Sequence, residues 1–227
     1  MLVRNWMSRN VVTVEEDTSM QDATKLLKQH GIRMLPVVRE GRLVGVVTDR
    51  DLKRASPSDA TTLDVHELNY LISKIKVKSI MTKNPVSVPP DMTVEETAEV
   101  LLQHKISGAP VVDNGRVVCT ITQTDIFRVL IALTGVGKRG IQIAVQIEDR
   151  PGSIKELADP IRRHNGRMVS ILTSYDNVPQ GERKVYIRLF GIERKALDSL
   201  KHELAQVPRC KLLYIIDHRE NRREIFE

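Results

Sequence analysis

Residues 34–52 read MLPVVREGRLVGVVTDRDL, and residues 108–126 read GAPVVDNGRVVCTITQTDI. These stretches belong to a longer repeat, in which residues 7–52 align with residues 81–126 without a gap, 74 positions apart. Seventeen aligned positions carry the same residue. Two copies of a unit that cannot bury its own apolar face usually pack on each other. We therefore expect a pseudo-two-fold pair, with a cleft between the copies that offers equivalent ligand sites twice.

Each copy predicts the element order β-α-β-β-α. The first helix of each copy begins with a capping-box pattern, Ser19 to Asp22 in one copy and Thr93 to Glu96 in the other. Two strands around a glycine turn follow, and then a second helix. The strands are expected at 34–38 and 43–47 in the first copy, and at 109–112 and 117–121 in the second.

The sharpest local signal is the junction between the last strand and the last helix of each copy. Thr48 and Asp51 form a further capping box, which needs no ligand. The same geometry suits a nucleotide, because a helix N-terminus offers N–H groups to an anion, Arg50 can fork onto phosphate and Asp51 can bridge ribose hydroxyls. In one copy alone, a plain capping box and a nucleotide site explain the pattern equally well. The equivalent pair Thr122 and Asp125 favours binding.

Composition describes a globular chain of 227 residues, 41% hydrophobic and 28% charged, with a net charge of +6. No apolar run is long enough to span a bilayer, and the first residues lack the apolar stretch of a signal peptide. Cys119 and Cys210 form neither a disulfide framework nor a metal cluster. We expect a cytoplasmic protein without a membrane partner. The basic residues are interleaved with acids, so nucleic-acid binding is not expected.

Catalytic patterns are missing from the sequence. There is no nucleophile–base pair, no paired carboxylate site and no metal-ligand spacing among the histidines, so we expect no enzyme activity, no catalytic residue and no metal. His30 and His104 fall at predicted helix ends, where an imidazole suits the helix dipole. Residues 134–140 contain Gly-x-Gly-Lys, but Arg139 stands where a phosphate loop needs a hydroxyl. A DNA-binding regulator is the alternative that the positive charge leaves open, although no helix-turn-helix pattern accompanies it.

The last third of the chain predicts a different unit. Its order β-α-β-β-α-β is that of a ferredoxin-like split βαβ fold. The expected strands are 141–147, 168–174, 184–190 and 210–217, and the expected helices are 153–164 and 194–206. Ser153 and Glu156 form another capping-box pattern. The charged residues 218–227 are expected to fray.

The paired motif of residues 3–133 resembles tandem CBS domains, the Bateman module, with its "PVV" strand and its strand–Gly–x–x–Thr–x–x–Asp–helix signature. The fold class implied is α/β (α+β). The resemblance implies an adenine nucleotide, AMP, ADP or ATP, as a regulatory ligand in the cleft between the copies. Carried onto this sequence, the nucleotide-binding residues are Thr13, Arg33, Met34, Thr48, Arg50, Asp51, Ser87, Ser107, Ala109, Thr122 and Asp125.

Two departures make the implied sites unequal. Cys119 stands where the first copy has Gly45, and Thr124 stands where it has Arg50. A side chain in place of glycine is expected to crowd a ligand, and the lost cation weakens phosphate binding. The Thr48/Asp51 site is therefore expected to bind the phosphorylated ligand. The second site is expected to be empty or to take a less charged one.

Residues 140–217 resemble an ACT domain, through Asp149-Arg-Pro-Gly152, the helix that follows and Gly166. The resemblance implies an amino-acid effector near Pro151, Gly152 and Ser153, or a unit that only dimerises. Ligand-binding members often carry Asn or Asp where this chain has Met168, so dimerisation is favoured. The combination, with TDRDLKRASPS and the LTG linker, resembles the acetoin-utilisation AcuB family.

The predicted plan is a CBS domain at 1–64, a second at 65–134, a linker at 135–140, an ACT-like domain at 141–217 and a charged tail at 218–227. We expect a non-catalytic, homodimeric regulatory protein that senses an adenine nucleotide and relays it to the ACT domain or to a regulated protein, in acetoin or related carbon metabolism. The alternative is an amino-acid-responsive ACT dimerisation protein with a vestigial nucleotide cleft.

Overall fold

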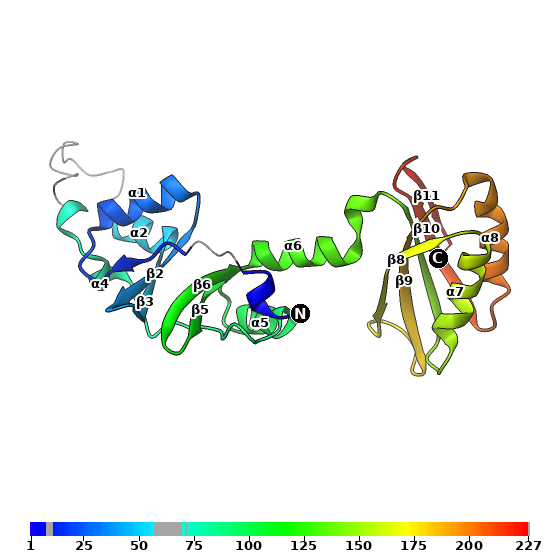
Figure 1. The fold of residues 1–227 in the computed structure, drawn as a ribbon, viewed down its shortest axis with the longest axis horizontal. Helices are drawn as coiled ribbons and strands as arrows, with labels where there is room; N and C mark the ends of the chain where they lie inside the picture. The colour runs from blue at the N-terminus through cyan, green and yellow to red at the C-terminus, as the bar shows by residue number, and fades with distance from the viewer. Residues whose placement is uncertain (8–10, 57–69, 71, 227) are drawn as a thin grey trace. The chain divides into compact units, whose positions relative to one another are not determined.

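A computed structural model describes residues 1–7, 11–56, 70 and 72–226. The chain forms two compact units, Met1–Phe127 and Arg128–Glu227, and the division falls within helix α6 (Figure 1). The boundary expected between the two copies, after residue 64, lies outside the described residues. Among the helices that the structure describes, none is both long enough and apolar enough to cross a bilayer.

The first unit contains both copies of the repeat. The first copy consists of β1 (Val14–Glu15), α1 (Met20–His30), β2 (Met34–Arg39), β3 (Arg42–Thr48) and α2 (Asp49–Ala55). The second copy consists of β4 (Thr82–Lys83), α5 (Val94–Gln103), β5 (Gly108–Asp113), β6 (Arg116–Thr122) and α6 (Gln123–Thr134). The short helices η1 (Val3–Asn5) and α4 (Val77–Ile80) precede the two copies.

The strands of the two copies join in one sheet with the order β1-β2-β3-β6-β5, and β4 pairs with β3. The hairpins β2–β3 and β5–β6 are antiparallel, and they meet at the single pair Arg42–Arg116. Each hairpin shifts register at the same repeat position, after Val37 in one and after Val111 in the other. The repeat thus extends from sequence to backbone geometry.

The structural repeat begins before residue 7, where the aligned stretch of the sequence starts. Val3 and Val77 lie 74 positions apart, and both are completely buried. The N–H of Val3 donates to the carbonyl of Met92, and the N–H of Val77 donates to the carbonyl of Thr18. Thr18 and Met92 are equivalent positions of the repeat, so the two hydrogen bonds are equivalent as well. Val3 therefore packs in the core of the second copy and Val77 in that of the first. Each copy lends its leading segment to the other.

The capping predictions for the first unit are largely confirmed. Thr93 with Glu96, and Thr48 with Asp51, form complete capping boxes. Ser19 caps α1 by accepting a hydrogen bond from the N–H of Asp22, without the reciprocal bond to its own N–H.

The second unit is a five-stranded antiparallel sheet with the order β11-β10-β7-β9-β8. Its elements are β7 (Ile141–Glu148), α7 (Ser153–Arg163), β8 (Arg167–Ser174), β9 (Glu182–Phe190), α8 (Leu197–Ala205), β10 (Cys210–Asp217) and β11 (Arg222–Ile225), with short helices η2 (Val136–Lys138) and η3 (Arg194–Ala196). Helices α7 and α8 cover one face of the sheet (Figure 1). Alternate residues of β7, from Ile141 to Ile147, point into the core between sheet and helices.

Two expectations for this unit are wrong. Ser153 does not cap α7, because Gly152 holds the cap position with φ of 89° and the Ser153 hydroxyl donates to the carbonyl of Arg150. Glu156 instead binds the guanidinium of Arg150, at 2.7 and 2.8 Å. The charged tail does not fray over β11, whose residues pair with β10.

The tail, residues 218–226, is held in place by contacts that could not be predicted from its charged composition. Glu224 forms a salt bridge with Lys201 of α8 at 2.7 Å, and Phe226 packs against the core of the unit. The ammonium of Lys201 also lies 4.4 Å from the centre of the Phe226 ring. One residue of α8 thus contacts two side chains of the tail.

Candidate functional site

A cavity of about 900 Å³ lies between the two copies of the first unit, and its walls come from both. One wall consists of residues around the β3–α2 junction and the start of β2. The other consists of residues 84–86, the turn after α5 and the start of β5. This is the cleft that the repeat predicts, and it is large enough for a nucleotide-sized ligand.

The structure brings together six of the eleven residues proposed for nucleotide binding. The residues that line this cavity are Arg33, Met34, Thr48, Arg50, Asp51 and Ser107. Thr13, Ser87, Ala109, Thr122 and Asp125 are not among its lining residues. The cavity is thus centred on the signature of the first copy, the one that keeps Arg50.

Thr48 and Asp51 hold each other in a fixed arrangement. The Thr48 hydroxyl donates to Asp51 Oδ2 at 2.6 Å, and the Thr48 N–H donates to the same oxygen at 2.9 Å. In return the N–H of Asp51 donates to Thr48 Oγ1 at 3.3 Å. Within the described part of the chain, Asp51 Oδ1 accepts no hydrogen bond. A half-buried carboxylate oxygen in a cavity is a suitable acceptor for hydroxyl groups of a ligand.

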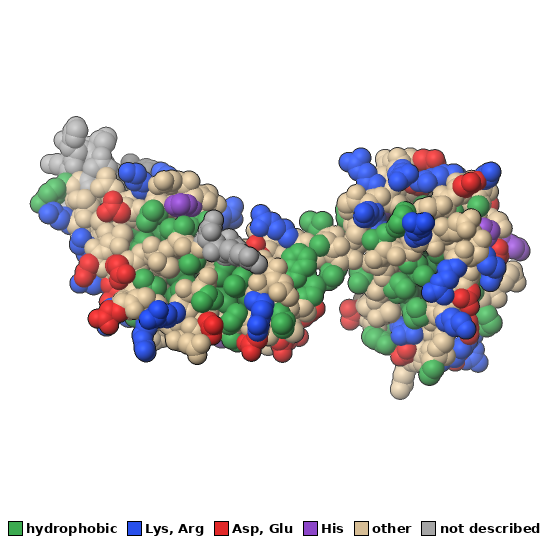
Figure 2. Space-filling model, viewed as in Figure 1, with side chains coloured by type: hydrophobic (Ala, Val, Ile, Leu, Met, Phe, Trp, Pro, Cys, Tyr) green, Lys and Arg blue, Asp and Glu red, His purple; other side chains and the backbone are tan. Residues whose placement is uncertain are grey.

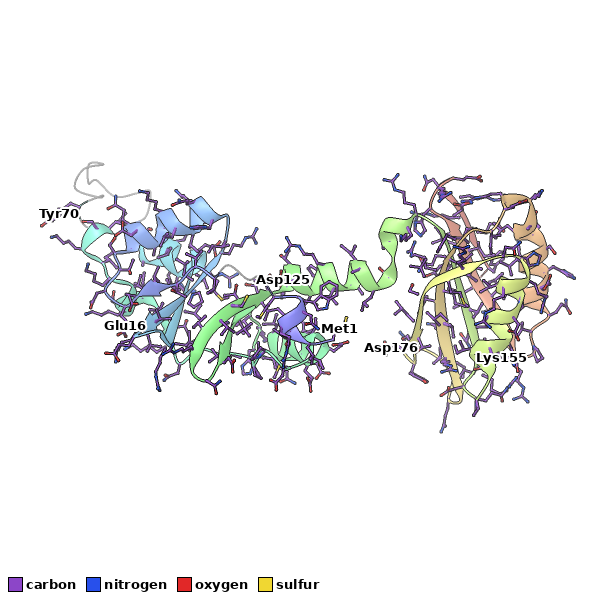
Figure 3. All side chains as sticks on the ribbon, viewed as in Figure 1. Met1, Glu16, Tyr70, Asp125, Lys155 and Asp176 are labelled. Atoms are coloured by element: carbon purple, nitrogen blue, oxygen red, sulfur yellow. The ribbon has the colours of Figure 1, made fainter. Side chains whose placement is uncertain are left out.

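The second signature repeats this geometry but has less contact with solvent. The Thr122 hydroxyl and N–H donate to Asp125 Oδ2 at 2.7 and 2.9 Å. Asp125 stands at the start of α6 (Figure 3) and is only 7% exposed. Gln123 is the residue of this junction that reaches the cavity.

The strand preceding each signature shows which backbone lies at the cleft. Met34 pairs with Thr48, and Gly108 pairs with Thr122, so these two residues are equivalent. Gly108 lines the cavity, whereas Ala109 is completely buried in the core of the second copy. The 74-residue offset of the repeat relates Met34 to Gly108, whereas choosing the residue just before Pro110 gives Ala109. The repeat offset is therefore the sequence signal that identifies Gly108 as the residue at the cleft.

Gly45 serves packing between the copies rather than approach of a ligand. A Cβ built on Gly45 would lie 2.5 Å from Met81 Sδ and 3.0 Å from the carbonyl oxygen of Thr82. Strand β4 lies against β3 at this point, where Gly45 pairs with Lys83. Cys119, the equivalent residue, is completely buried in the core, so the expectation that its side chain crowds a ligand is wrong.

The cavity also contains charged residues that sequence reasoning missed. Lys53 and Arg54 line it from α2, and His104 and Lys105 line it from the turn after α5. Helical spacing could have found Lys53 and Arg54, because residues three and four positions after Arg50 share its face of the helix. Lys105 has no such signal, since it lies in the other copy.

Basic residues outnumber acidic ones in this cavity. Among the described residues, those that line it are the basic Arg33, Arg50, Lys53, Arg54 and Lys105 and the acidic Asp49 and Asp51. None of the five basic side chains forms an ion pair within the part of the chain that the structure describes. Such a cavity favours an anionic ligand.

On the visible face of the molecule, basic side chains are scattered over both units and alternate with acidic ones (Figure 2). No continuous basic field is visible on that face, of the kind that would track a nucleic-acid backbone.

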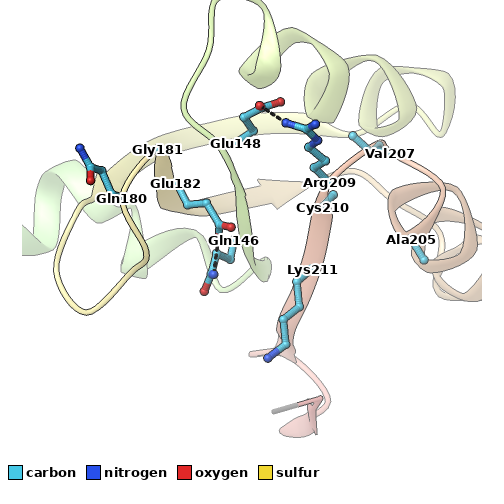
Figure 4. A pocket seen from close by; sticks show the side chains of 10 residues that line it. All are labelled: Gln146, Glu148, Gln180, Gly181, Glu182, Ala205, Val207, Arg209, Cys210 and Lys211. Carbon is cyan, nitrogen blue, oxygen red and sulfur yellow. Dashed lines mark hydrogen bonds and ion pairs between the residues drawn. The ribbon is translucent and has the colours of Figure 1, made fainter.

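In the second unit, the proposed effector residues do not line the cavity that the structure contains there. Pro151 and Gly152 are exposed, while Ser153 is 4% exposed and its hydroxyl accepts a hydrogen bond from Arg183 at 2.9 Å. A cavity of about 600 Å³ lies instead between β7, the loop before β9 and the start of β10 (Figure 4). Its Glu148 is paired with Arg209, and its Gln146 donates to Glu182.

The family model for the CBS domain matches residues 3–58 and 77–132. A CBS domain-containing protein of Dictyostelium discoideum is 35% identical over 132 residues, which cover 57% of this chain and 91% of that protein. Inosine-5'-monophosphate dehydrogenase of Korarchaeum cryptofilum is 33% identical over 124 residues, 54% of this chain, and the match spans only 23% of that enzyme.

Solved structures give similar results. The crystal structure of a protein assigned to acetoin utilization (AcuB) from Vibrio cholerae is 27% identical, with a TM-score of 0.50, over 61% of this chain and 96% of that one. The CBS domain pair of protein MJ0100, solved in complex with 5'-methylthioadenosine and S-adenosyl-L-methionine, is 32% identical, with a TM-score of 0.48, over 57% of this chain and 95% of that one. The matches of the CBS-domain model to both copies, together with the Dictyostelium relative, show that this chain belongs to the CBS-domain family and contains a tandem CBS pair.

Proposed function

We propose that this chain is a non-catalytic regulatory protein that binds an adenine nucleotide between its two CBS copies. One observation carries the proposal: Thr48, Arg50 and Asp51 of one copy line the same cavity as residues 104–108 of the other copy. A ligand in this cavity contacts both copies at once. Its binding therefore favours one arrangement of the pair over others, which is the requirement for a regulatory signal.

The lining residues suit the three parts of a nucleotide. Asp51 Oδ1 accepts hydrogen bonds from the ribose hydroxyls, while Oδ2 stays bonded to Thr48. Arg50 binds phosphate through its guanidinium, which is matched to phosphate oxygens. Met34 and Ile106 supply apolar surface from the two copies for the adenine ring.

A thermal-shift titration tests this proposal. Adenosine, AMP, ADP and ATP are added to the full chain, with methylthioadenosine, S-adenosylmethionine and GTP as further probes. A ligand that binds only the folded state stabilises it by about 2.7 kcal/mol at 100 times its Kd, so a saturable rise in Tm is expected with an adenine nucleotide. The absence of any shift at millimolar nucleotide would refute the proposal.

For the second unit we propose a ferredoxin-like ACT domain that dimerises and receives the signal. Its order β-α-β-β-α-β, with β10-β7-β9-β8 adjacent in the sheet, supports this assignment. Helix α6 supports the relay, because it begins at the Thr122–Asp125 box and ends at Thr134, whose carbonyl accepts a hydrogen bond from Ser170 of β8. Pro151, Gly152 and Ser153 are the proposed amino-acid site, which the same titration with amino acids tests.

The regulated process that we propose is acetoin or related carbon metabolism. The support is the similarity to the AcuB structure from Vibrio cholerae, nearly all of which this chain covers. Deletion of the gene in its source organism should impair growth on acetoin but not on glucose. Equal growth of the deletion strain on both carbon sources would refute this part of the proposal.

A further inference from the structure

We propose that Lys105 binds the outer phosphates of the ligand and makes the cleft selective for ADP and ATP over AMP. This inference rests on the proposed function, because it concerns the same cavity. It assigns a role to a residue of the second copy, opposite the Thr48–Asp51 signature of the first. Two observations support it: the backbone of Lys105, and its place among the charged residues that line the cavity.

The backbone of Lys105 is in an unfavourable conformation for a lysine. Its φ is 53°, in the left-handed region that glycine adopts most readily. The equivalent residue of the first copy is Gly31, with φ of 62°, which ends α1 in the usual left-handed cap.

The two turns make equivalent hydrogen bonds. The N–H of Ile32 donates to the carbonyl of Leu27, and the N–H of Ile106 donates to that of Leu101, both at 3.0 Å. Local structure therefore needs the left-handed backbone here but no side chain. Other non-glycine residues of this chain, such as Glu40, share this backbone conformation, but Lys105 combines it with a charged side chain that lines the cavity.

The place of Lys105 puts positive charge on a second wall. Arg50, Lys53 and Arg54 line the cavity from α2 in the first copy, and Lys105 lines it from the second. A single phosphate bound beside Arg50 leaves the cation across the cleft without a partner. A chain of two or three phosphates carries charge toward both walls.

The balance of charge points the same way. Five basic side chains and two carboxylates of the described residues line the cavity, so an uncharged adenosine or a cationic S-adenosyl group leaves most of this positive charge unmatched. Each additional phosphate of the ligand neutralises more of the positive charge in the cavity. The cleft is therefore built for the more highly charged members of the adenine-nucleotide series.

The test compares three variants of the full chain by calorimetric titration with AMP, ADP and ATP at fixed ionic strength. Lys105→Gly removes the charge and relieves the backbone cost, Lys105→Gln removes only the charge, and Lys105→Arg keeps the charge. Asn114→Gly is the control, because Asn114 has φ of 49° and does not line the cavity.

We expect the unmodified chain to bind ATP at least about tenfold more tightly than AMP, and the Gly and Gln variants to lose ATP affinity by about tenfold or more. Their affinity for AMP should change by less than about threefold. Lys105→Arg and Asn114→Gly should bind as the unmodified chain does. The ligand-free Tm of Lys105→Gly should stay the same or rise, as should that of Asn114→Gly.

Equal affinity of the unmodified chain for AMP and ATP would overturn the inference and leave the proposed function intact. Unchanged ATP affinity in Lys105→Gln, or an equal loss for AMP and ATP, would also overturn it. Failure of every adenine nucleotide to bind the unmodified chain would refute the proposed function itself, and this inference with it.

Discussion

Met81 of the second copy packs directly on Gly45 of the first, where its sulfur occupies the space that a Cβ would need. The contact belongs to an exchange in which each copy receives the segment that precedes the other. It makes Gly45 a packing residue between the copies, although it lies three residues before Thr48. The cleft is thus shaped by a contact that does not itself touch a ligand.

Gly45→Ala should destabilise the first unit by about 1–3 kcal/mol, because the added methyl meets both the Met81 side chain and the backbone of Thr82. Chemical denaturation followed by circular dichroism measures the change. Gly137→Ala is the matched control, because a Cβ at Gly137 meets no atom within 4 Å. Equal stability of the Gly45→Ala variant and the control would contradict this packing role.

Asp51→Asn should weaken ATP binding by roughly tenfold to a hundredfold, because a charged acceptor for the ribose hydroxyls is lost. Asp125→Asn should bind ATP nearly as tightly as the unmodified chain, since Asp125 is not among the residues that line the cavity. The two boxes have nearly equal hydrogen-bond lengths, so each variant should lose a similar stability from its box, on the order of 1 kcal/mol. Calorimetric titration and thermal melts measure the two effects separately. Equal loss of affinity in both variants would place the nucleotide elsewhere.

The stability of the second unit should fall in acid through Asp217. Its carboxylate is 2% exposed and accepts two hydrogen bonds from Arg194, at 2.7 and 2.8 Å. Burial alone would raise the pKa of Asp217, but the bonds from Arg194 and from backbone N–H groups outweigh it and lower that pKa. The stabilisation is therefore present above the unfolded pKa, near 3.8, and is lost as pH falls through the folded value.

Asp217→Asn should lower the free energy of unfolding of the second unit by about 2–4 kcal/mol at pH 7, and should make its Tm less sensitive to pH below 4. Thermal melts from pH 2 to 7 measure both. The exposed Asp198, changed to Asn, is the control and should behave as the unmodified chain does. An unchanged acid dependence in Asp217→Asn would contradict the assignment.

Cys119 and Cys210 should react slowly with iodoacetamide in the folded protein. Burial raises the pKa of each thiol from its usual 9.0 to about 11, so the thiolate fraction at pH 8 is about 100-fold lower than that of an ordinary thiol. Mass spectrometry after timed alkylation, with and without denaturant, measures the rates. Alkylation of folded Cys119 as rapid as that of a small free thiol would be inconsistent with its burial.

The sequence predicted the features that depend on local pattern. The repeat, its β-α-β-β-α order and the boxes at Thr48 and Thr93 follow from residue spacing alone, and the structure contains them. The exchange of the leading segments was not predicted, because Val3 and Val77 are identical within a stretch where the other equivalent residues differ. Their shared role becomes visible only when both are seen buried in exchanged positions.

Features that depend on distant contacts could not be predicted. Gly45 looked like a residue that admits a ligand, because nothing in the sequence places Met81 above it. The tail looked mobile because its charges are evident, whereas its partners, Lys201 and strand β10, come from distant parts of the unit. Lys105 was missed for the same reason, since the other side of its cleft lies more than fifty residues away in the chain.

The most direct test of nucleotide binding in the cleft is the stoichiometry of ATP binding to the full chain by isothermal titration calorimetry. We expect one ATP bound per chain, with this binding weakened in Asp51→Asn and retained in Asp125→Asn. Undetectable binding of ATP, ADP and AMP at millimolar concentration, or binding that Asp51→Asn leaves unchanged, would contradict it.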